Sequence, residues 1–435
     1  MANGYGDALG ERTPTAGERL PNGCILDLVR EEGTDALGLI VWNKSKTAIA
    51  GQFKYQDKTY IPLELEPSFR AAVQLPARAA NGVSPTSEFC GDIGSEIARF
   101  TGLSGRPLDS VVYFILGTWL VDCVPIAPFL SIVAPARADG VLLLQLLASF
   151  CRRSLLLSAD GPTDLWTVPM HLHPTLLLDA AELSAPVRGF LRSSNRRGIP
   201  CARKGKILDL YCAKAICTQE PIADRALASS ALQITLPPKR RQLPVLTAEE
   251  SRELAQDYQA ELLRYRLENI HRVCPPQLDV SELTAAAQGL ARSLAACILD
   301  DPKLQSEIVP LLRSQDGAAQ VQRSAGMETV ILEGLLVRCH EGKKPTLLVA
   351  ELAATANSIL VERGESIQFS PESVGWKLRS LGLRTEPIGS GGNGLWLSQE
   401  MHAKIHRLAF EFGLPLSQLE ASTGCPHCSK REGKV

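Results

Sequence analysis

The sequence predicts an α/β protein with a mostly parallel central sheet, a small β-rich module before it and a compact helical unit with a hairpin after it. Three observations support this fold class. Short apolar runs alternate with helical stretches in the middle of the chain, which is typical of strands buried on both faces. Two strand-like runs joined by a polar turn precede them. Capped helices and a glycine-rich hairpin follow them.

Composition limits the classes of protein that remain. The chain has 435 residues, 45% of them hydrophobic, which excludes wholesale disorder and suggests about three domains. With 46 Lys+Arg and 47 Asp+Glu the net charge is −1, so a globally basic nucleic-acid coat is excluded but a local basic face is not. Twelve cysteines in a chain of this length do not indicate a disulfide scaffold. We expect a cytoplasmic protein with free thiols.

The N-terminal part divides into an expected tail and a β-rich module. Residues 1–22 are rich in Gly, Thr and Pro and predict a disordered tail. Over 23–104, the runs 48–55 and 59–65 flank a polar turn and predict a hairpin.

The core is expected over 105–245, and a helical lid region over 246–341. Five apolar runs predict the core strands, at 129–133, 154–157, 175–178, 213–217 and 232–236. The apolar stretch 111–133 contains Asp122, Pro125 and Pro128, so we predict a buried helix followed by a strand, not a membrane span. Thr247 and Glu250 form a capping box at the start of the lid region.

The C-terminal part predicts a winged helix over 342–412, before a polar tail at 413–435. Ser370 and Pro371 are an N-cap and a first helical residue, and Gly382 ends that helix. A glycine-rich segment between two short strand-like runs then predicts the wing.

The loop after the first core strand stands where a phosphate-binding loop would be. Its candidate residues lack the lysine and the hydroxyl that such a loop needs, and Asp139 adds a negative charge. These residues are Ala134, Pro135, Ala138, Asp139, Gly140 and Val141. Asp179 ends a later strand and is a residual Walker B acid, but Ala180 follows it where an ATPase often has Glu. The alternative is that Asp179 caps the next turn.

Two basic regions are candidate DNA contacts. The segment 191–206 contains Gly198 and Pro200, which predict a turn that presents its basic side chains either to a phosphate backbone or to solvent or a subunit. These side chains are Arg192, Arg196, Arg197, Arg203, Lys204 and Lys206. In the winged helix, we expect Lys377 and Arg379 to face outward, Arg384 to lie on the wing, and Trp376 to pack inside. A winged helix used for protein contacts is the alternative.

Cys425 and Cys428 resemble half of a zinc site. A structural zinc site needs about four ligands, and the nearest further candidates are His402, His406 and His427. Their spacing is irregular, so we expect no metal.

The order of these pieces resembles the primase-helicase-like P-loop ATPases of phages and mobile elements, of the AAA+ or superfamily-3-like kind. The resemblance covers about residues 105–410 and rests on segments such as "FILGTWLVDCVPIAPF", "LRSSNRRGIPCARKG", "LLRYRLENIHRV" and "SPESVGWKLRSLGL". It implies an α/β P-loop NTPase-like core with a helical lid, and a C-terminal winged helix that binds DNA. The family's arginine would fall at Ser230, with Arg225 close by.

This combination predicts a catalytically degenerate, DNA-binding or assembly protein of a replication or mobile-element complex. ATP and Mg²⁺ are disfavoured as cofactors, no membrane partner is expected, and protein partners or self-association are possible. Two alternatives remain open. One is an active DNA-dependent ATPase or helicase with an unorthodox nucleotide site, and the other is a protein-interaction scaffold that does not bind DNA.

Overall fold

The computed structural model describes residues 11–44, 46–82, 84–159, 165–168, 170–222, 224–237, 243–324, 327–341, 344–362, 368–389, 392–414, 425 and 427. For 225, 226, 316–324 and 327 it describes the backbone alone. The chain forms two compact units, Met1–Arg313 and Ser314–Val435.

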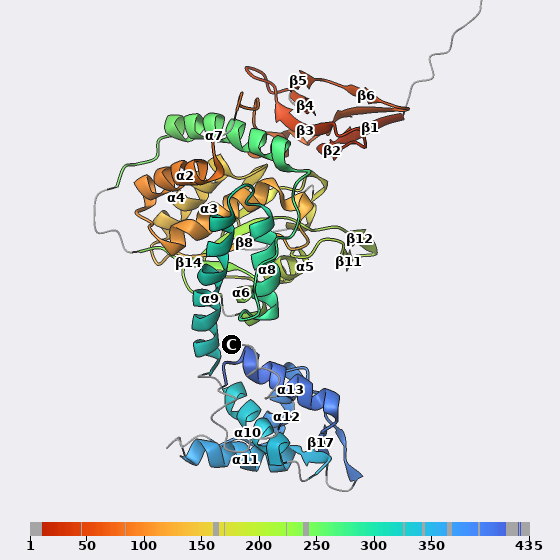
Figure 1. Ribbon diagram of the computed structural model, residues 1–435, viewed down its shortest axis with the longest axis vertical. Helices are drawn as coiled ribbons and strands as arrows, with labels where there is room; N and C mark the ends of the chain where they lie inside the picture. The colour runs from red at the N-terminus through yellow and green to blue at the C-terminus, as the bar shows by residue number, and fades with distance from the viewer. Residues whose placement is uncertain are drawn as a thin grey trace, which may run out of the picture. The chain divides into compact units, whose positions relative to one another are not determined.

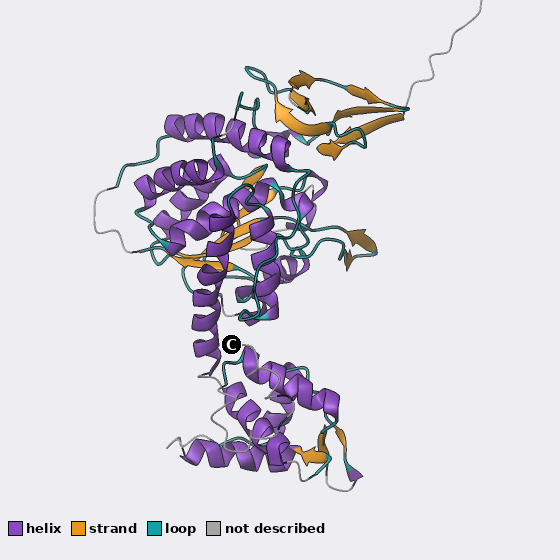
Figure 2. Ribbon diagram, in the orientation of Figure 1, coloured by secondary structure: helices purple, strands orange, loops and turns teal. Residues whose placement is uncertain are grey.

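The first unit is built on a five-stranded parallel sheet (Figures 1 and 2). Its strand order is β14-β8-β13-β10-β9, so the first of these strands in the chain lies between the last two. The strands are β8 (Phe129–Val133), β9 (Ser154–Ser158), β10 (Thr175–Asp179), β13 (Lys214–Thr218) and β14 (Leu232–Thr235). All five predicted core strands are confirmed, and the sheet with its helices is consistent with a P-loop-like α/β core.

Both faces of this sheet are buried, as the continuous apolar runs predicted. Leu177 of β10 belongs to an apolar cluster with the helical layer, while its neighbours Leu176 and Leu178 belong to a second cluster on the opposite face. The helical layer includes α2 (Thr86–Thr101), α3 (Arg106–Trp119), α4 (Arg137–Phe150), α7 (Ala248–Asn269), α8 (Ala285–Ala296) and the first half of α9 (Pro302–Ser324). The opposite face carries α5 (Ala185–Ser193). Helices α7 and α8 of the predicted lid therefore pack into the core itself.

The apolar stretch 111–133 forms the end of α3, a 3₁₀ turn η1 (Val121–Cys123) and β8, as predicted. Among the described residues, no helix combines the length and the hydropathy that crossing a bilayer requires.

The N-terminal residues are ordered further than expected. The prediction of a disordered tail over 1–22 is wrong for 11–22, because β1 (Glu11–Thr15) pairs with β7 (Lys58–Pro62), and Ala16 and Leu20 are buried. β7 also pairs with β6 (Phe53–Tyr55) across the predicted turn. A four-stranded antiparallel sheet contains β2 (Gly17–Arg19), β3 (Ile25–Arg30), β4 (Leu37–Asn43) and β5 (Lys46–Ala50), and helix α1 (Pro67–Ala72) follows β7.

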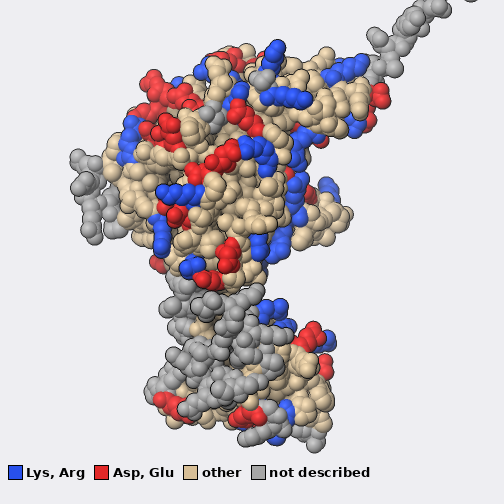
Figure 3. Space-filling view, viewed as in Figure 1, with Lys and Arg blue, Asp and Glu red and all other residues tan. Residues whose placement is uncertain are grey.

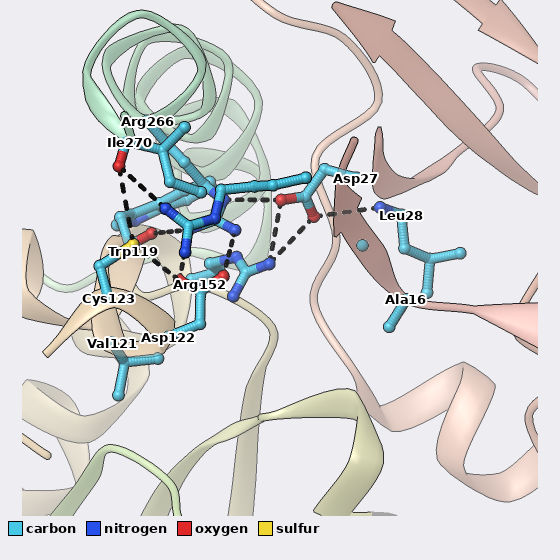
Figure 4. A network of polar contacts seen from close by, with 12 residues as sticks. Ala16, Asp27, Leu28, Trp119, Val121, Asp122, Cys123, Arg152, Arg266 and Ile270 are labelled. Carbon is cyan, nitrogen blue, oxygen red and sulfur yellow. Dashed lines mark hydrogen bonds and ion pairs between the residues drawn. The ribbon is translucent and has the colours of Figure 1, made fainter. Parts of the chain in front are cut away.

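A buried charge network joins this β-rich module to the core (Figure 4). Asp27 of β3 accepts hydrogen bonds from Arg152 at 2.9 Å, Arg153 at 2.6 Å and Arg266 of α7 at 2.7 Å. Arg266 also pairs with Asp122 of η1 at 2.6 Å. The side chains of Asp27 and of the three arginines are at most 3% exposed.

These contacts keep the network ionised. Burial raises the pKa of Asp27, but the three guanidinium groups outweigh it and hold the pKa well below its usual range. Burial and the two neighbouring arginines lower the pKa of Arg152 to about 10, which still leaves it charged at neutral pH. Three cations therefore share two carboxylates in the interior, and Asp27 contacts all three cations.

The second unit contains α10 (Met327–Glu341), β15 (Thr346–Leu348), α11 (Val349–Glu362), α12 (Pro371–Ser380), β16 (Glu386–Pro387), β17 (Asn393–Trp396) and α13 (Gln399–Glu411). Its sheet is antiparallel with the order β15-β17-β16. Ser370 caps α12 by accepting a hydrogen bond from the Ser373 amide, as predicted. Helix α10, which the sequence placed in the lid region, packs instead with α11 and α13, because Ile331, Leu335 and other apolar side chains face this unit's core. Helix α9 (Pro302–Ser324) precedes it.

We predict that Asp27→Asn destabilises the first unit by about 3–5 kcal/mol, because it leaves three buried guanidinium groups with too little negative charge. Denaturant unfolding of the full chain measures this. The control is Asp35→Asn, which removes a largely exposed partner of Arg30 and should change the unfolding free energy by at most about 1 kcal/mol. Equal effects of the two substitutions would contradict the central role of Asp27.

Candidate nucleotide and nucleic-acid sites

The loop at the phosphate-binding position is short. β8 ends at Val133 and α4 begins at Arg137, so three residues join them. The first of these, Ala134, is buried, and its amide donates a hydrogen bond to the Thr218 carbonyl of β13 at 2.8 Å. A phosphate-binding motif has about six residues up to its second glycine, whose backbone wraps the phosphates. Three residues are too few to form such a cradle.

Protein atoms occupy the space behind this loop. Gly140 in the first turns of α4 is buried, and a Cβ atom there would lie 2.1 Å from Cys217 Sγ and 2.8 Å from Ala134 Cβ. Burial raises the pKa of the Cys217 thiol to about 12, so this contact is made by a neutral side chain. Gly140 is therefore explained by close packing of α4 against β13.

An arginine neutralises the candidate Walker B acid. Asp179 lies at the carboxyl end of β10, and its Oδ2 accepts hydrogen bonds from Nη2 of Arg137 at 2.8 Å and from Nε at 3.2 Å. The Asp179 side chain is 17% exposed and that of Arg137 41%. A guanidinium group thus contacts the carboxylate oxygen that a Walker B acid would use to hold Mg²⁺. The sequence left open that the Asp179 side chain caps the turn after β10. The structure shows it bound to Arg137 of α4.

Sequence reasoning missed Arg137, although a signal was present. Arg137 follows one core strand and Asp179 ends another, and the carboxyl ends of parallel strands meet at one edge of a sheet. Of the other family positions, Ser230 donates a hydrogen bond to the Leu227 carbonyl at 2.9 Å. The side chain of Arg225 lies outside the described residues.

The basic segment forms α5 and a two-stranded hairpin of β11 (Cys201–Arg203) and β12 (Lys206–Leu208). Its turn residues Lys204 and Gly205 both have positive φ, at 47° and 74°, as a two-residue hairpin turn of type I′ requires. The turn or hairpin predicted around Gly198 and Pro200 is confirmed, with a turn at Arg197 and Gly198 and the hairpin directly after it, whereas the start of the segment, up to Ser193, is helical. Gly198 also has positive φ, but it bends the chain before the hairpin.

Three of the predicted basic side chains contact other residues. Arg192 pairs with Asp224, Arg197 donates to the Asp122 carbonyl, and Arg203 stacks 4.0 Å from the centre of the Trp166 ring. Five of the six are exposed: Arg192, Arg196, Arg197, Lys204 and Lys206.

A cavity of about 580 Å³ lies beside α5 and is lined by Arg192, Arg196 and Ser230, among others. Figure 3 shows Lys and Arg side chains along the side of the unit near the hairpin, whereas acidic side chains gather near α2 and α7.

The second unit corrects two expectations. Trp376 of α12 is 69% exposed and does not pack inside, and Trp396 of β17 is 53% exposed. Lys377 does not face freely outward, because its Nζ lies 2.7 Å from Glu328 Oε1 of α10. Arg379 is exposed and lies 4.7 Å from the centre of the Trp376 ring, and Arg384 is exposed just before β16.

Two of the candidate metal ligands, His406 and Cys425, lie close together, and they are joined by His340, which the sequence did not suggest. His406 of α13 lies near Cys425 and near His340 of α10, and one ligand atom from each falls within 4.8 Å of the others. The His427 ring lies 5.4 Å from that of His406 and 6.3 Å from that of His402. Cys428 lies outside the described residues.

No family model and no curated protein matches the sequence. Similar solved structures include an apo form of the C-terminal region of NrS-1, with a TM-score of 0.35 and 10% identity over 86% of this chain and 97% of that one. A full-length MCM homolog from Methanopyrus kandleri has a TM-score of 0.38 and 13% identity over 68% and 78%. Cdc6p from Pyrobaculum aerophilum has a TM-score of 0.17 and 12% identity over 71% and 94%. Scores at this level do not establish a shared fold.

We predict that Gly140→Ala destabilises the first unit by about 1–3 kcal/mol, because the new methyl group overlaps Cys217 and Ala134. The control is Gly91→Ala in α2, where a Cβ meets nothing within 4 Å and alanine should stabilise the helix by about 0.5–1 kcal/mol. Cys217→Ala should partly rescue Gly140→Ala in denaturant unfolding. Stabilisation by both glycine substitutions would show that the space behind the loop is open.

Proposed function

We propose that this chain is a catalytically inactive relative of P-loop ATPases that binds DNA or assembles partners in a replication or mobile-element complex. The observation that carries the proposal is the Arg137–Asp179 pair at a three-residue loop. This pair supports the proposal because the acid that would hold the metal ion is bound to a protein cation, and the loop that would bind the phosphates is short.

The missing groups are those on which phosphoryl transfer depends. The transition state is stabilised by a lysine, by Mg²⁺ held on a hydroxyl and an acid, and by an arginine. The loop supplies neither lysine nor hydroxyl, Ala180 follows Asp179, and Ser230 stands at the arginine position. Removing one such stabilising group costs about 10²–10³ in rate. Mg²⁺ would also have to displace Arg137 from Asp179, so we assign no nucleotide and no metal cofactor to this site.

The order of helices and strands in the second unit supports a DNA-binding function. Helix α10, strand β15, helices α11 and α12, and the β16–β17 hairpin follow one another as in a winged helix, with α12 in the position of the recognition helix. Arg379 on α12 and Arg384 before the hairpin are exposed cations on this unit. In the first unit, Arg196, Lys204 and Lys206 are exposed on or beside a separate hairpin. Cations of this kind bind phosphates without reading sequence.

A protein-binding role for the second unit is the competing function, and two exposed tryptophans favour it. Trp376 and Trp396 present large apolar rings at 69% and 53% exposure. Exposed tryptophan is typical of protein contact surfaces, where the ring becomes an anchor. The two functions differ in their response to salt.

Fluorescence anisotropy with labelled duplex and single-stranded DNA at rising salt tests the proposal. We expect binding at low salt that weakens steeply as the salt concentration rises. In a plot of the logarithm of the association constant against the logarithm of the salt concentration, each duplex phosphate contacted should add about −0.9 to the slope. The double variant Arg379→Ala/Arg384→Ala should lower this slope by up to about two such contacts. MgATP should leave the affinity unchanged.

The matched control is Lys54→Ala/Lys58→Ala, which removes two exposed cations from the N-terminal sheets and should leave the slope unchanged. Absence of binding at low salt would eliminate the DNA function and leave protein assembly. Binding that requires MgATP would contradict the loss of the nucleotide site.

A further inference from the structure

The second unit contains a cluster of nitrogen and sulfur ligands that the proposed function does not use. His340 lies in the last turn of α10, His406 lies in α13, and Cys425 follows α13 in the chain. The Nε2 atoms of the two histidines are 3.1 Å apart, and the Cys425 Sγ is 3.4 Å from His406 Nε2. All three side chains are buried or half-buried.

These separations match those of ligands around one tetrahedral zinc ion. With Zn–N of about 2.05 Å and Zn–S of about 2.3 Å, tetrahedral angles place two nitrogens about 3.3 Å apart and a nitrogen and a sulfur about 3.6 Å apart. The observed 3.1 and 3.4 Å are each shorter by only about 0.2 Å. The ligand atoms of all three residues lie within 4.8 Å of one another, close enough to share one metal ion.

The orientation of His406 is fixed as in metal sites. Its Nδ1 donates a hydrogen bond of 2.7 Å to the His402 carbonyl one turn earlier in α13. The ring proton is thus held on Nδ1, and the Nε2 lone pair points toward His340 and Cys425.

The sequence offers a candidate for a fourth ligand. Cys425 begins the segment Cys425-Pro426-His427-Cys428, and the Cys-x-x-Cys spacing is the one by which two thiolates bind a single structural zinc ion. We propose that His340, His406 and Cys425 bind one zinc ion. The Cys425 thiol releases a proton to solvent when the metal binds. The ion joins α10 and α13 to Cys425.

Metal analysis of the purified full chain tests this proposal. After reconstitution with Zn²⁺ and removal of unbound metal, we expect one zinc ion per chain, and a chelator should remove it reversibly. Co²⁺ in its place should show the absorption of a tetrahedral ion with thiolate-to-metal charge transfer. A chain that retains no zinc, or a cobalt spectrum without the thiolate band, overturns the proposal.

Single substitutions test each ligand. His340→Ala and Cys425→Ser should each lower zinc affinity about 100-fold or more, because each removes a ligand from the metal itself. The matched control is His271→Ala, an exposed histidine of the first unit, which should retain full affinity. Unchanged affinity in His340→Ala would overturn the proposal.

A further pair of variants examines the candidate fourth ligand without altering the two helices. Cys428→Ser should weaken zinc binding and remove part of the thiolate band, whereas His427→Ala should do neither. The reverse result would overturn the assignment of Cys428. Circular dichroism of each apo variant separates loss of a ligand from loss of the fold, since a folded variant that no longer binds zinc supports the ligand role.

Discussion

The carboxylate of Asp27 is the contact on which the arrangement of the first unit depends. It comes from the β-rich module and meets Arg152 and Arg153 before β9 and Arg266 of α7. A buried ion pair is weak support for stability when both partners can be replaced together, but removing one partner leaves uncompensated charge in the interior. The module therefore cannot leave the core without exposing or stranding three guanidinium groups.

The apolar packing around Asp27 also holds the β-rich module on the core. Leu26 and Leu28 of β3 belong to the apolar cluster on one face of the parallel sheet, while Ile25 and Val29 belong to the cluster of the helical layer. One strand of the module thus contributes to both cores. The sequence pattern changes at about residue 104, from a β-rich module to alternating strands and helices. The structure does not divide into two independent hydrophobic cores there.

The second arginine–aspartate pair, Arg137–Asp179, has a different role. Because both side chains are partly exposed, it contributes at most about 1 kcal/mol to stability. Under the proposed function its importance is electrostatic, since Arg137 neutralises the candidate metal-binding acid. The three-residue loop and the close packing of Gly140 on Cys217 support the same proposal, because they leave little room for a phosphate.

Much of the fold could be predicted from sequence because it follows from local pattern. The five core strands, the cap at Ser370 and the missing lysine and hydroxyl of the loop are all readable from residues near one another. The remaining features depend on partners distant in the chain. Arg137 meets Asp179, Lys377 meets Glu328, and His340 meets His406 only after folding. Strand β1 escaped prediction for the same reason, since its order comes from pairing with β7.

Isothermal titration calorimetry of the full chain with MgATP tests whether the nucleotide site is lost. We predict no saturable binding, with any dissociation constant above about 1 mM, equivalent to less than about 4 kcal/mol. We predict the same for Arg137→Ala, because the three-residue loop remains after the cation is removed. Micromolar, magnesium-dependent binding by the natural sequence would show that the nucleotide site is intact.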